Sequence, residues 1–128
     1  MIRQLSAPEL HKFLEHLKVS KKTDVLIVYA FATWCGFCMR NPQTGLANFE
    51  SQVSGLSNNS EIRGRIFKYD ASKTETQQAF LKATGQQVTS FPSIYCFYNV
   101  DGHLRIAKVP ANGQYINKLH KLENLIRQ

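Results

Sequence analysis

The sequence lacks the features that mark several large classes of protein. Its longest apolar run, Val25 to Ala32, is too short to span a bilayer. The first residues, Met-Ile-Arg-Gln-Leu-Ser, are not followed by the charged and apolar segments of a secretory leader. We therefore expect a cytoplasmic protein without a membrane span, and a periplasmic or other location if a leader has been removed. Without repeats, low-complexity tracts or linkers, residues 1–128 are predicted to form one domain.

Cysteine and acidic residues are both scarce. Three cysteines, two of them spaced as C-x-x-C, fit redox or metal chemistry rather than a disulfide scaffold. Lys and Arg number 16 against 9 Asp and Glu, a formal charge of +7. The basic residues form no run of five, so nucleic-acid binding is not favoured. The charge predicts a solvated basic surface, with attraction to an acidic protein partner or a polyanion as the alternative.

Apolar periodicity predicts four helices. Ser6-x-x-Glu9 is a capping box for a helix ending near Val19. A second helical stretch runs from Met39 to Val53 and should be kinked by Pro42. The third helix is capped by Ser72-x-x-Glu75 or Thr74-x-x-Gln77 and closed by Gly85, and a fourth, capped by Asn112, runs from Tyr115 to Ile126.

Apolar and β-branched runs between these helices predict the strands. They are 2–5, 25–31, 65–70, 93–98 and 103–109, with a turn at 99–102 that contains Asp101-Gly102. The run 25–31 is apolar throughout, as in a strand buried on both faces. Alternating helices and strands predict an α/β fold, a sheet covered on both faces with an antiparallel pair at its end.

The pair Cys35 and Cys38 stands where the buried strand gives way to a helix. At a helix N-cap, unpaired backbone N–H groups favour a thiolate, so Cys35 is the predicted nucleophile. Cys38 follows about one turn later and could resolve a mixed disulfide formed on Cys35. A structural zinc site would need four ligands, and the sequence offers no second pair with the spacing of metal ligands. We expect neither a metal nor an organic cofactor.

Two motifs, one at the cysteine pair and one at Pro92, resemble motifs of the thioredoxin family. The stretch from Phe31 to Cys38 resembles the family's redox signature, and Val88–Ser93 resembles the loop that holds a cis-proline opposite the cysteines. The resemblance extends from Ile2 to Ile126. It implies a thioredoxin fold, with a central mixed five-stranded sheet flanked by four helices. It also implies disulfide exchange with protein substrates in electron transfer and cell redox homeostasis.

The resemblance also implies a substrate groove beside the cysteines. Its residues would be Trp34, Gly36, Phe37, Phe91, Pro92, Ser93 and Pro110. Pro92, in a cis peptide bond with Phe91, would shape the groove, and the backbone N–H of Ser93 could pair with an extended substrate strand. Trp34, Phe37, Phe91 and Pro110 would form an exposed apolar rim that binds proteins.

Several residues depart from the family pattern. Gly36-Phe37 replaces the usual Gly-Pro, and Tyr29 stands where the family has a buried aspartate. Unlike proline, Phe37 has a backbone N–H, which we expect to donate to the Cys35 sulfur and to make the site more oxidising than a Gly-Pro site. Lys68, the family's partner of that aspartate, would then point outward or find another acid. Tyr29 and Lys68 are therefore expected to modulate the site. These departures argue against the housekeeping thioredoxin role and against reduction by thioredoxin reductase.

Three functional alternatives remain open from the sequence. The chain is a disulfide reductase, an extracytoplasmic disulfide isomerase or oxidase, or a thioredoxin-fold interaction module that uses its cysteines little. The third cysteine, Cys96, lies in a predicted strand and is expected to be a small buried core residue, with a regulatory thiol as the minor alternative.

Overall fold

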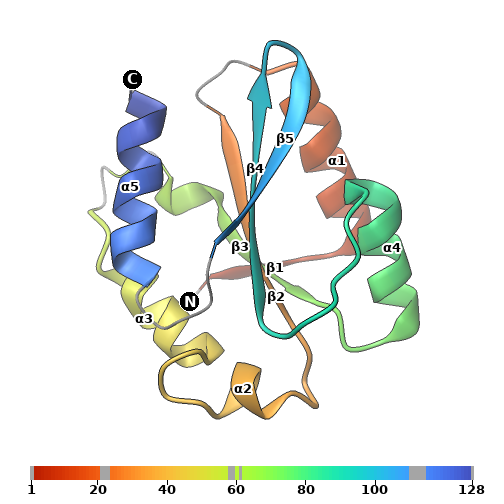
Figure 1. Cartoon of the computed structure of the whole chain (residues 1–128), viewed down its shortest axis with the longest axis vertical. Coiled ribbons are helices and arrows are strands. Elements are labelled where there is room, and N and C mark those ends of the chain that lie inside the picture. The colour runs from red at the N-terminus through yellow and green to blue at the C-terminus, as the bar shows by residue number, and fades with distance from the viewer. Residues whose placement is uncertain (1, 21–23, 58–59, 61, 110–114, 128) are drawn as a thin grey trace.

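The computed structural model describes residues 2–20, 24–57, 60, 62–109 and 115–127 (Figure 1). The strands are β1 (Arg3–Leu5), β2 (Val25–Phe31), β3 (Ile66–Asp70), β4 (Ser93–Val100) and β5 (His103–Val109). The helices are α1 (Ala7–Lys18), α2 (Gly36–Met39), α3 (Leu46–Ser54), α4 (Thr74–Thr84) and α5 (Tyr115–Arg127), with a 3₁₀ turn at Arg63–Arg65. In this part of the chain, no helix is long and apolar enough to cross a membrane.

The five strands form one mixed sheet in the order β1-β3-β2-β4-β5. β1, β3 and β2 are parallel, and β4 and β5 are antiparallel to their neighbours. All residues of the central strand β2 are buried, because helices cover both faces of the sheet. The predicted fold class, an α/β protein with a mixed five-stranded sheet, is confirmed.

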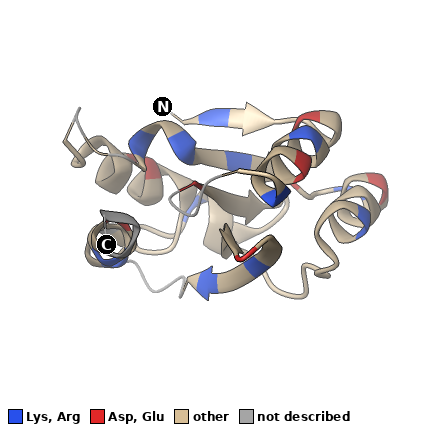
Figure 2. Ribbon diagram, turned by 90° about the horizontal axis from the view of Figure 1, so that it is seen from above, with Lys and Arg blue, Asp and Glu red and all other residues tan. Residues whose placement is uncertain are grey.

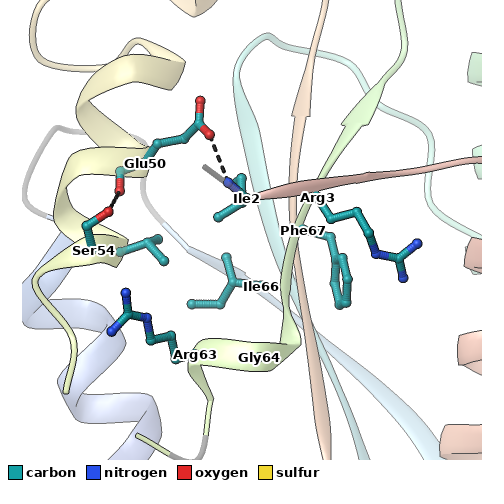
Figure 3. A pocket seen from close by; sticks show the side chains of 9 residues that line it. Ile2, Arg3, Glu50, Ser54, Arg63, Gly64, Ile66 and Phe67 are labelled. Carbon is teal, nitrogen blue, oxygen red and sulfur yellow. Dashed lines mark hydrogen bonds between the residues drawn. The ribbon is translucent and has the colours of Figure 1, made fainter. Parts of the chain in front are cut away.

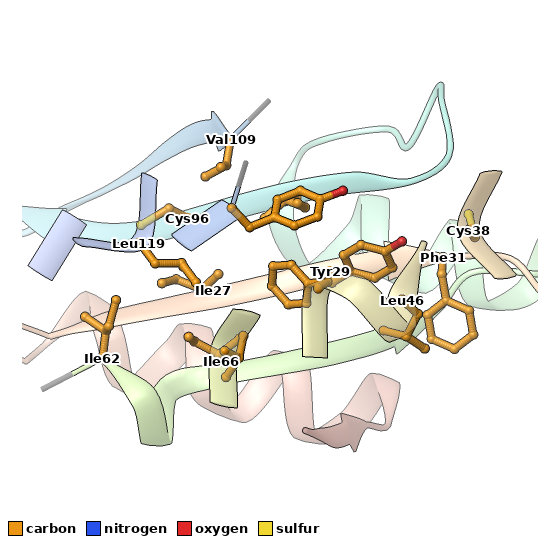
Figure 4. Close-up of a cluster of buried hydrophobic side chains, with 14 of the residues drawn as sticks. Ile27, Tyr29, Phe31, Cys38, Leu46, Ile62, Ile66, Cys96, Val109 and Leu119 are labelled. Carbon is orange, nitrogen blue, oxygen red and sulfur yellow. The ribbon is translucent and has the colours of Figure 1, made fainter. Parts of the chain in front are cut away.

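Four helices flank the sheet, as predicted, in two layers (Figure 1). α3 and α5 pack over one face, above a cluster that contains Tyr29, Cys38 and Phe49 (Figure 4). α1 and α4 cover the other face, where Phe80 of α4 is fully buried. The fifth helix, α2, is a single turn at one end of the molecule. The cysteine pair therefore belongs to the core of the α3 and α5 layer.

The helix predicted from Met39 to Val53 is wrong as a continuous element. The chain leaves α2 after Met39 and turns at Asn41, whose side-chain oxygen accepts the N–H groups of Gln43 and Thr44 at 2.9 and 3.0 Å. A Cβ on Gly45 would lie 2.4 Å from the Asn41 carbonyl oxygen, so this turn requires glycine. Pro42 therefore stands in a loop between two helices rather than at a kink.

Some of the predicted helix and strand ends agree with the structure, and others do not. The Ser6 capping box is present, and Gly85 closes α4 with a positive φ of 74°. α4 begins one residue after Lys73, and neither predicted capping residue caps it; the Thr76 hydroxyl accepts the Lys73 N–H instead. β4 continues to Val100, so the hairpin turn is shorter than predicted. The predicted cap Asn112 lies outside the described residues.

Lys and Arg are spread over helices and strands on several sides of the molecule (Figure 2). No single element gathers them, which agrees with the absence of a basic run in the sequence. The described fold thus carries its positive charge as a dispersed surface property.

Candidate active site

Cys35 caps a helix of one turn. It is the N-cap of α2, and its sulfur accepts the backbone N–H of Cys38 at 3.2 Å. This donor corrects the expectation that the Phe37 N–H would reach the sulfur; among the described hydrogen bonds, Cys38 alone donates a backbone N–H to it. α2 is a single turn, so this directed bond is the interaction that the Cys35 sulfur receives from the helix.

The two thiols differ in access. Cys35 is 8% exposed and Cys38 is fully buried. Burial, together with the hydrogen bond to Cys35, raises the pKa of the Cys38 thiol to about 12. Of the two cysteines, only Cys35 has exposed surface, and its raised pKa keeps the Cys38 thiol protonated at neutral pH.

The loop before β4 lies against Cys35. The Phe91–Pro92 peptide bond is cis, as expected, and the Phe91 carbonyl oxygen faces the Cys35 thiol at 3.6 Å. Pro92 and Ser93 are buried, and the Ser93 hydroxyl donates to the Ser90 carbonyl oxygen. The main-chain carbonyl of Phe91 is thus the group of this loop that contacts Cys35.

An apolar rim surrounds the cysteine. We use this term for Trp34, Phe37 and Phe91. Trp34 is 62% and Phe37 64% exposed, and the Trp34 ring meets Phe91 edge-on at 5.2 Å. Met39, the last residue of α2, is also exposed. Pro110 lies outside the described residues.

A hydrogen-bond network that the sequence did not reveal holds the rim in place. The Trp34 indole N–H donates to the Ser72 carbonyl oxygen at 2.9 Å, and the Thr33 N–H donates to the Ser72 hydroxyl at 2.7 Å. Ser72 is held in turn by the Asp70 carboxylate, which accepts its N–H and its hydroxyl. Ser72 appeared in the sequence only as a possible helix cap, because its partners lie 38 and 39 residues away.

Tyr29 lies fully buried within the cluster that holds the cysteines. Its hydroxyl donates to the Thr44 carbonyl oxygen at 2.7 Å, and burial followed by the nearby Cys38 raises its pKa. Its neighbour in β3, Lys68, forms an ion pair with Glu50 of α3 at 3.9 Å. Lys68 has therefore found another acid, one of the two outcomes that the sequence predicted.

Glu50 connects three elements at a hollow of about 280 Å³ (Figure 3). Besides binding Lys68, its carboxylate accepts the N–H of Ile2, which ties the start of β1 to α3 at 2.9 Å. The hollow is lined by β1, α3 and the start of β3, and the cysteines are not part of its lining. It is thus separate from the candidate active site.

Among the residues that the structure describes, no third metal-binding side chain gathers with Cys35 and Cys38. Nowhere in the described ranges do three or more His, Cys, Asp or Glu side chains gather as a metal site. Cys96 is buried in β4, as expected, and its pKa is raised to about 12 by burial. The arrangement of the described groups suits thiol–disulfide chemistry.

Comparisons with known proteins support the fold. No protein-family model and no curated protein matches the sequence. Among solved structures, the chain is similar to the Trx4 domain of ERdj5, with 16% identity, a TM-score of 0.59 and 96% of each chain covered. It is also similar to thioredoxin f2 of Chlamydomonas reinhardtii, with 17% identity, a TM-score of 0.57, and 98% of this chain and 95% of that chain covered.

Proposed function

We propose that this chain, which has the thioredoxin fold, exchanges disulfides with protein substrates and acts as a disulfide reductase. The observation that carries the proposal is the unequal burial of two neighbouring thiols: Cys35 keeps a small exposed surface, and Cys38 has none. A dithiol site needs this order, because the accessible thiol must attack first and the enclosed one must wait.

The proposed reaction has two steps. The Cys35 thiolate attacks one sulfur of a substrate disulfide, so that the substrate S–S bond breaks, a Cys35–substrate disulfide forms and one substrate thiolate leaves. Cys38 then gives up its proton to solvent and attacks the Cys35 sulfur, so that the Cys35–substrate disulfide breaks, the Cys35–Cys38 disulfide forms and the second substrate sulfur leaves as a thiolate. The substrate gains two electrons and the protein loses two, so turnover requires a dithiol reductant to reduce the pair again.

The groups around Cys35 have distinct roles in this scheme. The Cys38 N–H stabilises the attacking thiolate. Before ionisation, the Cys35 thiol donates a hydrogen bond to the Phe91 carbonyl oxygen. The apolar rim offers exposed surface for a protein substrate next to the reacting sulfur. The direction of net electron flow depends on the reduction potential of the pair against that of its compartment, for which we propose the reducing cytoplasm.

The test combines three cysteine variants with a disulfide-containing protein such as insulin. Cys35→Ser should abolish reduction, and Cys38→Ser should accumulate a covalent adduct that is visible by mass and released by dithiothreitol. Cys96→Ala is the matched control, because Cys96 lies beside Ile27 at the end of the buried cluster opposite Cys38, and it should retain activity (Figure 4). Turnover by Cys38→Ser at the wild-type rate would refute its resolving role. A wild-type protein inert toward disulfides would favour the interaction module.

A further inference from the structure

We propose that the protein substrates of this site carry acidic residues next to their disulfide, because Arg40 and Lys108 place positive charge on two sides of the apolar rim. The inference rests on the proposed function and specifies its substrate class. An extended acidic segment would set an apolar side chain on Trp34 or Phe37 and direct its carboxylates toward the two cations.

Arg40 stands beside the cysteine motif itself. It follows α2 directly, and its side chain is exposed. A Cβ built on Gly36 would lie 3.3 Å from the Arg40 Nη2 atom and 3.8 Å from Nε, so the guanidinium covers the glycine between the two cysteines. A carboxylate approaching Cys35 from the α2 side would meet this planar donor group, which suits two-point binding of a carboxylate.

Lys108 lies beside the loop that precedes β4. It is an exposed residue of β5, and its Nζ atom lies 3.5 Å from the Ser90 hydroxyl. Ser90 directly precedes Phe91, whose carbonyl oxygen faces the Cys35 thiol. Arg40 and Lys108 thus border the nucleophile through two different segments of chain.

One carboxylate, Asp70, belongs to the hydrogen-bond network behind the rim. Its Oδ1 atom accepts both the N–H and the hydroxyl of Ser72, so this oxygen is engaged in the support of Trp34. Apolar surface bordered by cations matches a segment that combines an apolar residue with acids. Since exposed ion pairs contribute little affinity each, the effect should appear chiefly in the rate of encounter.

The experiment measures attack by Cys35 on two peptides that differ only in charge. Each peptide has one cysteine, blocked as a mixed disulfide with thionitrobenzoate, and a phenylalanine beside it. Two glutamates flank this pair in one peptide and two lysines in the other. Attack by the reduced protein forms the Cys35–peptide disulfide and expels the coloured thionitrobenzoate, which stopped-flow absorbance follows in a single turnover.

We expect the acidic peptide to react about tenfold faster than the basic one at low ionic strength, since two exposed pairs contribute roughly threefold each. Salt near 0.5 M should shrink the ratio, because the Debye length falls below roughly 5 Å. In the double variant Arg40→Glu/Lys108→Glu, the preference for the acidic peptide over the basic one should disappear or reverse. The matched control Lys121→Glu, on the exposed side of α5, changes the net charge by half as much and should leave most of the ratio intact.

Equal rates for the two peptides with wild-type protein would overturn the inference and leave the proposed function standing. A ratio that survives in the double variant, or that falls as far in Lys121→Glu, would also overturn it, because the preference would then come from the overall charge of +7. Failure of both peptides to release thionitrobenzoate would instead refute the proposed function, and this inference with it.

Discussion

The Tyr29 hydroxyl donates a hydrogen bond to the Thr44 carbonyl oxygen at 2.7 Å. Tyr115 of α5 donates to the same oxygen at 3.0 Å, so one loop carbonyl between α2 and α3 is held by two buried phenols. The raised pKa of Tyr29 keeps its hydroxyl protonated at neutral pH. Tyr29 thus fastens the loop that follows the cysteine pair and cannot accept the proton that Cys38 must lose.

Tyr29→Asp should speed the resolution of mixed disulfides. A carboxylate at this place could accept the Cys38 proton, which the phenol cannot. A trapped substrate adduct should decay faster in the variant when followed by stopped flow, with little change in the initial attack by Cys35. Tyr29→Phe is the matched control, because it removes the hydroxyl without supplying a base, and its adduct should decay at the wild-type rate.

Two results would count against this role of Tyr29. Equal decay in Tyr29→Asp and wild type would mean that water or another group already removes the Cys38 proton. Urea unfolding of Tyr29→Phe provides a separate check on the fastening role. The loss of one buried hydrogen bond should lower its free energy of unfolding by about 1 kcal/mol, since Tyr115 still satisfies the Thr44 carbonyl.

Phe37→Pro should change the reduction potential of the cysteine pair only slightly. Proline lacks an N–H, but the N–H that reaches the Cys35 sulfur belongs to Cys38 and would remain. The shift, measured by equilibration with glutathione, should be smaller than the roughly 30 mV expected from a lost hydrogen bond of about 1.4 kcal/mol. A fall of 30 mV or more would show that the Phe37 N–H does stabilise the thiolate, as the sequence suggested.

Ser72→Ala should loosen Trp34. The Ser72 hydroxyl accepts the Thr33 N–H and is held by Asp70, and Thr33 directly precedes the tryptophan. Trp34 is the only tryptophan of the chain, so its fluorescence anisotropy reports on this side chain alone. We expect lower anisotropy and slower attack on protein disulfides. Ser54→Ala, which removes an exposed hydroxyl bonded within α3, should change neither quantity, and an unaltered anisotropy in Ser72→Ala would disprove the anchoring role.

The protein should lose stability in alkali, and Cys96 should contribute to the loss. Its folded pKa of about 12 lies above the unfolded value of about 8.5. Between these values the unfolded thiol has released its proton and the folded one retains it, so the free energy of unfolding falls as pH rises. Between these two pKa values, a thiol of this kind lowers the free energy of unfolding by about 1.4 kcal/mol for each unit that the pH rises.

Urea unfolding at about pH 8, 9 and 10 tests this dependence. Cys96→Ala should start less stable, because it loses buried sulfur, and should then lose stability less steeply than the wild type. By about pH 10 the two curves should have approached each other by roughly 2 kcal/mol. Parallel curves would mean that Cys96 ionises as readily in the folded protein as in the unfolded chain.

The features predicted correctly from the sequence depend on neighbouring residues. The capping box of Ser6 and Glu9, the fully apolar strand β2 and the hairpin at Asp101-Gly102 each follow from a few adjacent positions. The cysteine motif and the loop at Pro92 were recognisable because each is a short continuous pattern. Local signals therefore located both the sheet and the reacting pair.

The features that were missed depend on residues far apart in the chain. The support of Trp34 by Ser72 and the pairing of Lys68 with Glu50 arise only when the sheet and helices assemble. The break between α2 and α3 was misjudged because apolar spacing continues through the Asn41 turn, whose side-chain hydrogen bonds leave no mark on periodicity. The Phe37 donor was misjudged because only the geometry decides which of two consecutive N–H groups reaches the sulfur.

The position of β5 has a consequence for how copies of the protein meet. It is an outer strand of the sheet, and an outer strand offers unpaired main-chain groups to any strand that approaches. Exposed Arg105 and Lys108 lie along it. A second molecule that paired there in antiparallel fashion with Arg105 opposite Arg105 would bring like charges together, which opposes self-association in that register.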